Sequence, residues 1–341
     1  MIRLGAGALA FESDHRTLLA ALALSVATGR AFAWKGFRRK AGGLDVAEAA
    51  FARWCADLSG GNLLGGSEGD TEVGLEPQSV ASGDYRLDVP GAVPALPFLR
   101  AALLPLARAG GESKLLVTGA THAAESETFE VTSSTWCVLL GRLGLDVEMK
   151  LKCAGFVPGG GGEIASRILG GAAWKAVELV RREELTAVRI VSAGALLPTH
   201  VQQRQAARAR SGVQISGLTP TVQLLELRAQ GGGSVVAVTG VYGTLPVTTS
   251  SVSERGKSAE AVGQEAAAGF RRFLNEVGVV PGMFVDSLVL FLAFAKGPSV
   301  LTTPRLTQAA MWSTRLAGAF TGRSFEIEGK LGRAARIEIR D

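Results

Sequence analysis

The chain has 341 residues, of which 47% are hydrophobic, so it is long enough for a large core plus a further module and too apolar for intrinsic disorder. Its formal net charge of +5 is compatible with a nucleic-acid partner but does not require one. Three widely spaced cysteines, Cys55, Cys137 and Cys153, form no Cys-x-x-Cys pair. They indicate reduced thiols, with no disulfide framework and no zinc site.

The apolar stretches are too short to span a membrane. None reaches the roughly 20 residues that a bilayer requires, and the longest, Phe284 to Ala295, is interrupted by Asp286. Leu18 to Ala33 has the composition of a signal peptide, but Glu12 and Asp14 precede it where a basic segment belongs. We therefore expect a core helix there, a cytoplasmic location and no membrane partner.

Periodicity and turn residues predict that the first 89 residues fold as strand, helix, strand, helix, strand, strand. The expected elements are a strand over residues 2–10, a helix from Thr17 to Thr28 capped by Ser13 or Asp14, a strand from Ala31 to Gly36, a helix from Asp45 to Leu58, and strands at Glu72 to Glu76 and Asp84 to Val89.

That order of elements recurs twice, which indicates an internal repeat of one α/β unit. The second copy is expected to comprise helices at Leu96 to Ala109 and Phe129 to Leu143, a strand at Lys114 to Thr118, and two strands around a glycine-rich loop, the first at Val147 to Cys153. The third is expected to comprise helices at Pro281 to Lys296 and Arg305 to Leu316, and strands at Ser324 to Glu328 and Ala334 to Ile339.

A segment of different character separates the second and third copies. Its expected elements are strands at Ala187 to Ala195, Thr221 to Arg228 and Ser234 to Val241, a helix from Thr199 to about Arg210, and a long helix from Ser258 to about Val277. We therefore predict an inserted small α+β domain at residues 186–276, and a core of three repeats at 1–185 plus 277–341.

Four consecutive glycines, Gly159 to Gly162, stand in the segment Gly-Phe-Val-Pro-Gly-Gly-Gly-Gly-Glu-Ile that begins at Gly155. Glycine adopts positive φ without steric cost and admits close approach of another chain. Consecutive amides in such a loop also form a concave nest that attracts anions. A flexible turn between two strands is the alternative interpretation of this composition.

The segment from Gly155 resembles the Gly-Phe-Tyr-Pro-x-Gly-Gly-Gly segment of the RNA 3′-terminal phosphate cyclase family. Leu22 to Arg30, Asp286 to Leu290 and Thr199 to Val201 are similar to further phrases of that family, in the same order. The resemblance implies an α/β (α+β) fold of three βαβαββ repeats with an insert before the third. It also implies ATP-dependent cyclisation of RNA 3′-phosphate ends through a histidine that accepts AMP.

The nucleophilic histidine of that family is missing from this chain. The family's Ser-x-His-x-x-Thr-Asn phrase matches Leu301 to Gln308, where the histidine position falls on or beside Pro304. The three histidines are His15, His122 and His200, so no shift of alignment places one after residue 200.

Other family motifs are altered as well. The phrase Gly-Glu-Gly-Gly-Gly-Gln falls on Phe11 to Arg16, which keeps Glu12 and loses every glycine. Of the two arginines in Ile-Arg-x-x-Arg, the first is Gly36 and the second survives as Arg39, and a histidine in the next helix becomes Glu48. The nucleotide- or RNA-binding residues implied by the resemblance and its surrounding charges are Glu12, Arg16, Arg38, Arg39, Gly160, Gly161, Gly162 and Asp286.

His15 is the one candidate for a relocated nucleophile, because it stands at a helix start where a phosphate could bind. A solvated histidine in a capping segment is the alternative. Arg204, Arg208 and Arg210 fall roughly on one face of the insert helix, where they could track an RNA backbone or form a solvated polar face.

The first hypothesis is a cyclase-like protein without cyclase activity, which binds RNA ends, contacts a ribonucleoprotein or acts in RNA processing, and uses no cofactor. The second is an active cyclase with a relocated nucleophile, which would need ATP and Mg²⁺. A third, a small-molecule transferase like the enolpyruvyl transferases, fits badly because those proteins have two lobes. Weak, salt-dependent RNA binding through Arg38 and Arg39 is expected under the first. The oligomeric state is left open.

Overall fold

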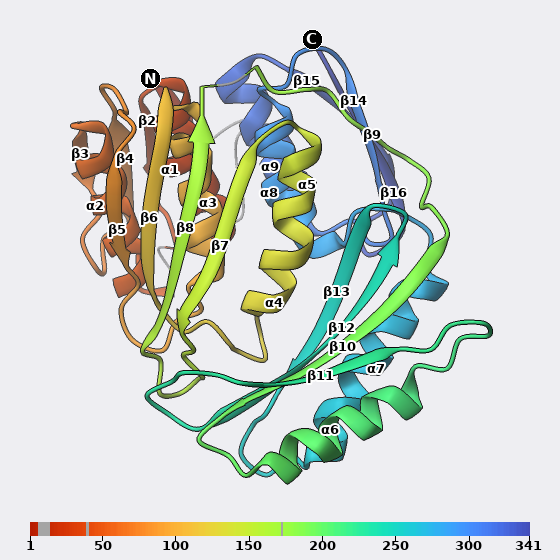
Figure 1. Ribbon diagram of the computed structural model, residues 1–341. Helices are drawn as coiled ribbons and strands as arrows, with labels where there is room; N and C mark the ends of the chain where they lie inside the picture. The colour runs from red at the N-terminus through yellow and green to blue at the C-terminus, as the bar shows by residue number, and fades with distance from the viewer. Residues whose placement is uncertain (6–13, 39–40, 172) are drawn as a thin grey trace.

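The computed structural model describes residues 1–5, 14–38, 41–171 and 173–341 (Figure 1). Three small mixed sheets, each with its own helices, enclose a common core, and a fourth sheet carries two further helices. The expectation of an α/β fold with three βαβαββ repeats and an insert is confirmed. The proposed strand over residues 2–10 falls partly outside the described residues, and its described part is the strand β1.

The first unit contains β1 (Ile2–Leu4), α1 (His15–Thr28), β2 (Phe32–Lys35), α2 (Val46–Ser59), β3 (Asn62–Gly65) and β4 (Glu72–Glu76). Its strands lie in the order β1-β2-β4-β3, with β1 parallel to β2 and the other pairs antiparallel. Local signals set the helix ends. The Asp14 carboxylate accepts a hydrogen bond from the Thr17 amide at 2.7 Å, and Gly29 ends α1 with φ of 68°.

The second unit contains β5 (Asp84–Asp88), α3 (Leu96–Arg108), β6 (Gly111–Gly119), α4 (Phe129–Val131), the π-helical turn η3 (Thr132–Trp136), α5 (Cys137–Arg142), β7 (Asp146–Cys153) and β8 (Gly162–Gly170). The third contains β9 (Glu178–Leu179), α8 (Gly282–Leu292), β14 (Ser299–Thr303), α9 (Gln308–Thr321), β15 (Ser324–Gly329) and β16 (Ala335–Arg340). Their strand orders, β5-β6-β8-β7 and β9-β14-β16-β15, repeat the topology of the first unit.

Some strands belong to other units than the sequence pattern indicates. The strand expected at Asp84 to Val89 pairs with β6 and therefore opens the second unit, whereas β3, which the pattern does not predict, completes the first. The third unit begins with β9, which pairs with β14, so the insert interrupts this unit after its first strand. The helix expected from Arg305 begins instead at Gln308, where the Thr307 side chain caps it.

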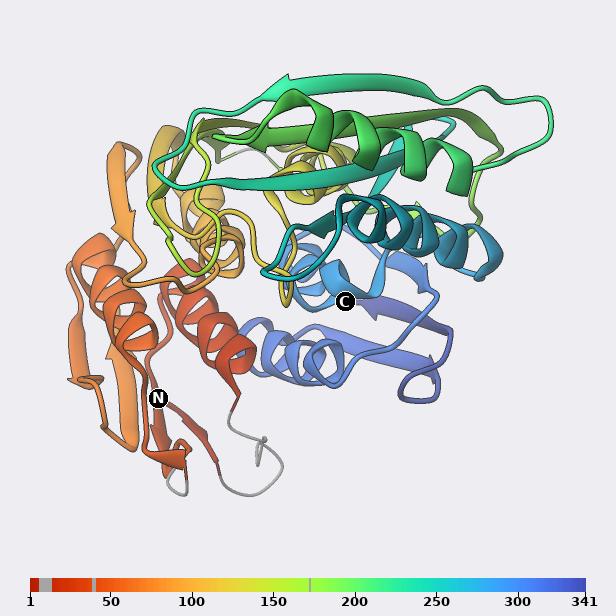
Figure 2. The ribbon, with the colours of Figure 1, turned by 90° about the horizontal axis from the view of Figure 1, so that it is seen from below.

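The segment between β9 and α8 builds the fourth sheet, with strand order β11-β10-β12-β13. Its elements are β10 (Leu185–Ala195), α6 (Thr199–Gly212), β11 (Thr221–Glu226), β12 (Gly233–Tyr242), β13 (Leu245–Val252) and α7 (Ala259–Asn275). Both helices cover one face of the sheet, and the other face packs against the second unit (Figures 1 and 2). Whether residues 186–276 form an independent domain stays a prediction.

The helices α1, α3, α8 and α9 pack against one another in the middle of the molecule, with the three core sheets outside them (Figure 1). Every residue of α1 from Thr17 to Val26 is buried, as expected for a helix that is apolar all round. Among the described residues, no helix is both long and apolar enough to cross a membrane.

A buried arginine joins the second and third units. Arg100 on α3 is 1% exposed, and its Nε lies 2.8 Å from a carboxylate oxygen of Glu127. Its guanidinium also donates to the Ser287 hydroxyl at 2.9 Å and lies 3.6 Å from Asp286, both on α8. Because Glu127 and Asp286 are buried too, the three charges are stable only together.

Replacing Arg100 by methionine is expected to lower the free energy of unfolding by roughly 3–5 kcal/mol, because it leaves Glu127 buried without a counter-charge. Urea denaturation followed by circular dichroism measures the decrease. The double variant Arg100→Met, Glu127→Met should recover much of it. The control Arg86→Met breaks an exposed pair with Asp88 and should change stability little. An equal decrease in both single variants would contradict this account.

Candidate functional site

A cleft of about 580 Å³ opens where the insert meets the core. It is bordered by the first turn of α1, the end of α7, the start of α8, and the β14–α9 and β15–β16 turns. The lining residues are Arg16, Arg272, Phe273, Glu276, Pro281, Gly282, Met283, Pro304, Arg305, Leu306, Thr307, Gln308, Leu331 and Gly332. Arginines from three separate segments thus border one cavity.

Pro304 lies in this cleft, at the turn between β14 and α9. Its ring nitrogen is part of a peptide bond, whose resonance delocalises the nitrogen lone pair, so this atom is not a nucleophile. The hydroxyl of Thr307 accepts a hydrogen bond from the Ala310 amide at 3.1 Å, as the cap of α9. All the chain's histidines lie in the described part, and none of them lines this cleft.

Arg16 and Asp286, both expected at the site, are brought together. An Arg16 guanidinium nitrogen lies 3.2 Å from Asp286 Oδ2, and Arg16 borders the cleft. Burial by itself would lower the pKa of Arg16, but the charges of Asp286 and Glu127 outweigh it and raise the pKa above its usual value. The Arg16 charge is therefore permanent and is partly balanced by Asp286.

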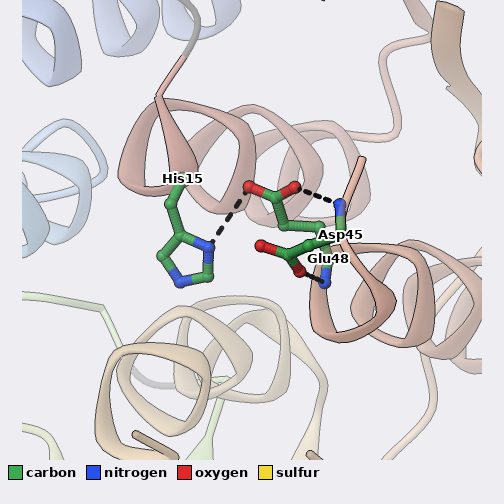
Figure 3. A group of neighbouring side chains, drawn as sticks. All are labelled: His15, Asp45 and Glu48. Atoms are coloured by element: carbon green, nitrogen blue, oxygen red, sulfur yellow. Dashed lines mark hydrogen bonds and ion pairs between the residues drawn. The ribbon is translucent and has the colours of Figure 1, made fainter. Parts of the chain in front are cut away.

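His15 belongs to a second cluster, between the starts of α1 and α2 (Figure 3). Its Nδ1 lies 3.3 Å from a carboxylate oxygen of the fully buried Glu48, and its ring packs edge-on against Phe98 on α3. Glu48 is also the third residue of a capping box, since it accepts from the Asp45 amide while Asp45 accepts from the Glu48 amide.

Arg38 supplies the positive charge of this cluster. Its guanidinium forms an ion pair with Glu48 and lies 3.4 Å from Asp45 Oδ2. His15, Asp45 and Glu48 together offer donor atoms of the kind that hold metal ions, all within 4.8 Å of one another. Because Arg38 already balances both carboxylates, this donor set fits a divalent cation poorly. The carboxylates of Glu48 and Asp45 therefore compete with RNA for the Arg38 guanidinium, which was expected to contact RNA.

The other two histidines have different surroundings. His122 is fully buried and stacks on Phe156, with Nδ1 2.7 Å from the Thr121 hydroxyl and Nε2 3.1 Å from Glu130. Burial alone would raise the pKa of Glu130, but the neighbouring His122 lowers it below its usual value. His200 is exposed in the first turn of α6.

The glycine loop is closely packed. Gly160 and Gly161 have φ of 64° and 73°, which favours glycine at both positions. A Cβ on Gly160 would lie 3.0 Å from the Gly91 carbonyl oxygen, and one on Gly161 would lie 2.8 Å from the Gln230 side chain. The loop therefore packs against both the β5–α3 turn of the second unit and the insert. Gly162 opens β8, and none of these glycines lines the arginine-bordered cleft.

The predicted residues thus divide into three groups. Arg16 lies at the cleft and pairs with the buried Asp286, His15 and Arg38 lie around Glu48, and Gly160 to Gly162 lie in the packed loop. Glu12 and Arg39 lie outside the described residues.

Sequence reasoning missed Arg272 and Arg305 in the cleft. Arg305 could have been noticed because it follows Pro304, but nothing local points to Arg272. On α6, Arg204 pairs with Glu260 and Arg208 donates to the side chain of Gln264, which favours the interpretation as a solvated face.

Comparison with known proteins identifies the family. A family model described as RNA 3′-terminal phosphate cyclase matches residues 11–327. The chain belongs to this family. An Archaeoglobus fulgidus protein named RNA 3′-terminal phosphate cyclase is 30% identical over 321 residues, covering 93% of this chain and 95% of its own length.

Proteins with the same name from Methylococcus capsulatus and Caldivirga maquilingensis are 29% and 28% identical to this chain. The first alignment covers 87% of this chain and 85% of the relative, and the second covers 92% of each. The likeness therefore extends over the core and the insert alike.

Replacing Gly155 by alanine should destabilise the protein, because the added Cβ would lie 2.3 Å from the Gly162 amide nitrogen and 2.8 Å from the Gly119 carbonyl oxygen. Overpacking against backbone typically costs about 1–3 kcal/mol. Gly159→Ala is the matched control, since its Cβ would make an ordinary 3.5 Å contact with Phe156. Thermal unfolding of the two variants compares them, and equal melting temperatures would refute the close-packing account.

Proposed function

We propose that this family member binds the 3′ end of RNA in the cleft and does not form a covalent AMP intermediate. The observation that carries the proposal is Pro304 in the cleft, beside Arg16 and Arg305. Phosphate binding needs positive charge and amide donors, whereas AMP transfer through the enzyme needs a nucleophile. The cleft offers arginines and contains no histidine among its described lining residues.

The cleft also fits a magnesium-bound nucleotide poorly. Mg²⁺ is usually held by one or two carboxylates together with the substrate phosphates. Asp286 is already paired with Arg16 and Arg100, and Glu276 is the one acidic residue among the described lining residues. No step of the proposed function therefore uses ATP or a metal ion.

His15 supports a second candidate function, an active cyclase with a relocated nucleophile. A carboxylate on Nδ1 orients an imidazole and leaves Nε2 as the nucleophilic atom, and Glu48 stands in that relation to His15. However, His15 contacts Glu48 on α2 and Phe98 on α3, whereas the adjacent Arg16 pairs with α8 and borders the cleft. The alternative would therefore need its own nucleotide site beside α2.

Incubation with α-labelled ATP and Mg²⁺, followed by denaturing gel electrophoresis, should give no labelled protein, because no described lining residue of the cleft is a histidine. A short RNA with a labelled 3′-phosphate should stay fully sensitive to phosphatase under the same conditions. Binding of that RNA, followed by fluorescence anisotropy, should be detectable at low salt and weaken as salt rises.

The variant His15→Ala separates the two candidate functions. A labelled protein that disappears in His15→Ala would establish the relocated nucleophile and overturn the proposal. The Archaeoglobus fulgidus relative, run in parallel, serves as the reference for detection of an adduct.

A further inference from the structure

Two arginines that border the cleft have no side-chain partner among the described residues. The guanidinium groups of Arg272 and Arg305 are exposed, and neither forms an ion pair or a side-chain hydrogen bond with any residue that the structure describes. Two nearby arginines differ in this respect. Arg16 is paired with Asp286, and the Arg182 guanidinium donates hydrogen bonds to backbone carbonyl oxygens.

These two arginines come from different parts of the chain. Arg272 lies in the last turn of α7, in the insert, and Arg305 lies in the β14–α9 turn of the third unit. Both positions are held firmly. Arg182 donates to the carbonyl oxygens of Phe273 at 2.6 Å and Gly278 at 2.9 Å, which fixes the end of α7. The Thr303 hydroxyl donates to the Arg305 carbonyl at 3.3 Å and fixes the turn.

The surroundings favour an anion between them. Helix α8 begins at Gly282 in the same cleft, and its N-cap, Pro281, has no side chain that could cap the first amides. The positive end of this helix therefore adds to the arginine charges. Glu276 is the one opposing carboxylate among the described lining residues, and the three arginines outnumber it.

We propose that Arg272 and Arg305 clamp the phosphate backbone of an RNA end between the insert and the third unit. This inference rests on the proposed function. It assigns the positive charge that binds the RNA phosphates to two arginines outside the family motifs. Guanidinium groups match phosphate geometry through paired donors. A cleft of about 580 Å³ falls within the usual range of small-ligand sites, so it suits the end of a single strand better than a duplex.

The test measures binding of a 5′-fluorescein-labelled single-stranded RNA with a 3′-phosphate to Arg272→Gln, Arg305→Gln and the double variant, over a series of salt concentrations. Each single variant should bind about five-fold or more weakly at low salt. The slope of log affinity against log salt should fall by about 0.7 for each arginine–phosphate ion pair that a variant removes. Melting temperatures should stay unchanged, because neither side chain has a partner within the described protein.

Arg208→Gln is the matched control, since it removes the same charge from an exposed position of the insert that does not border the cleft. It should retain the affinity and salt slope of the unmodified chain. If the unmodified chain binds no RNA, the proposed function itself fails. If it binds RNA and the Arg272 and Arg305 variants bind as Arg208→Gln does, the clamp is wrong while the proposed function stands.

Discussion

The pairing of Arg100 with two buried carboxylates holds the centre of the molecule together. Arg100 reaches from α3 to Glu127 in the second unit and to α8 in the third, and Asp286 on α8 in turn pairs with Arg16 at the start of α1. One chain of alternating charges therefore passes through all three units. Since each member is buried or half-buried, its geometry is constrained by the others, and the orientation of Arg16 at the cleft follows from this constraint.

The start of α1 separates two polar sites. Adjacent residues of an α-helix point about 100° apart, so His15 and Arg16 face different neighbours although they are consecutive. His15 meets Glu48 and Phe98, whereas Arg16 meets Asp286. Arg38 is the cation of the cluster around Glu48 and pairs with both Glu48 and Asp45. The carboxylates of this cluster therefore have a counter-charge within it, whereas Arg16 borders the cleft.

The repeat, the helices and the positive-φ glycines could be predicted because each depends on local pattern. Helix α1 depends on its apolar run and on the cap residue Asp14, and the positive φ of Gly160 and Gly161 depends on their residue type. The two-residue strand β9 could not, because its pairing with β14 is made across the whole insert. The cleft could not be predicted from the sequence for the same reason. Arg272 and Arg305 are 33 residues apart, and only the docking of α7 beside the β14–α9 turn places them on one cavity.

A covalent step and phosphate binding place different physical demands on the cleft. Catalysis through a covalent intermediate depends on one nucleophilic atom, and the amide nitrogen of Pro304, which lines the cleft, is not nucleophilic. Binding depends on a sum of charges, so it tolerates the loss of any one of them. Among the described lining residues of the cleft, the positive charges are Arg16, which is partly balanced by Asp286, and Arg272 and Arg305, which no described residue balances. Because Arg272 belongs to the insert, the charge available at the cleft depends on how α7 is held, and Arg182 provides that attachment.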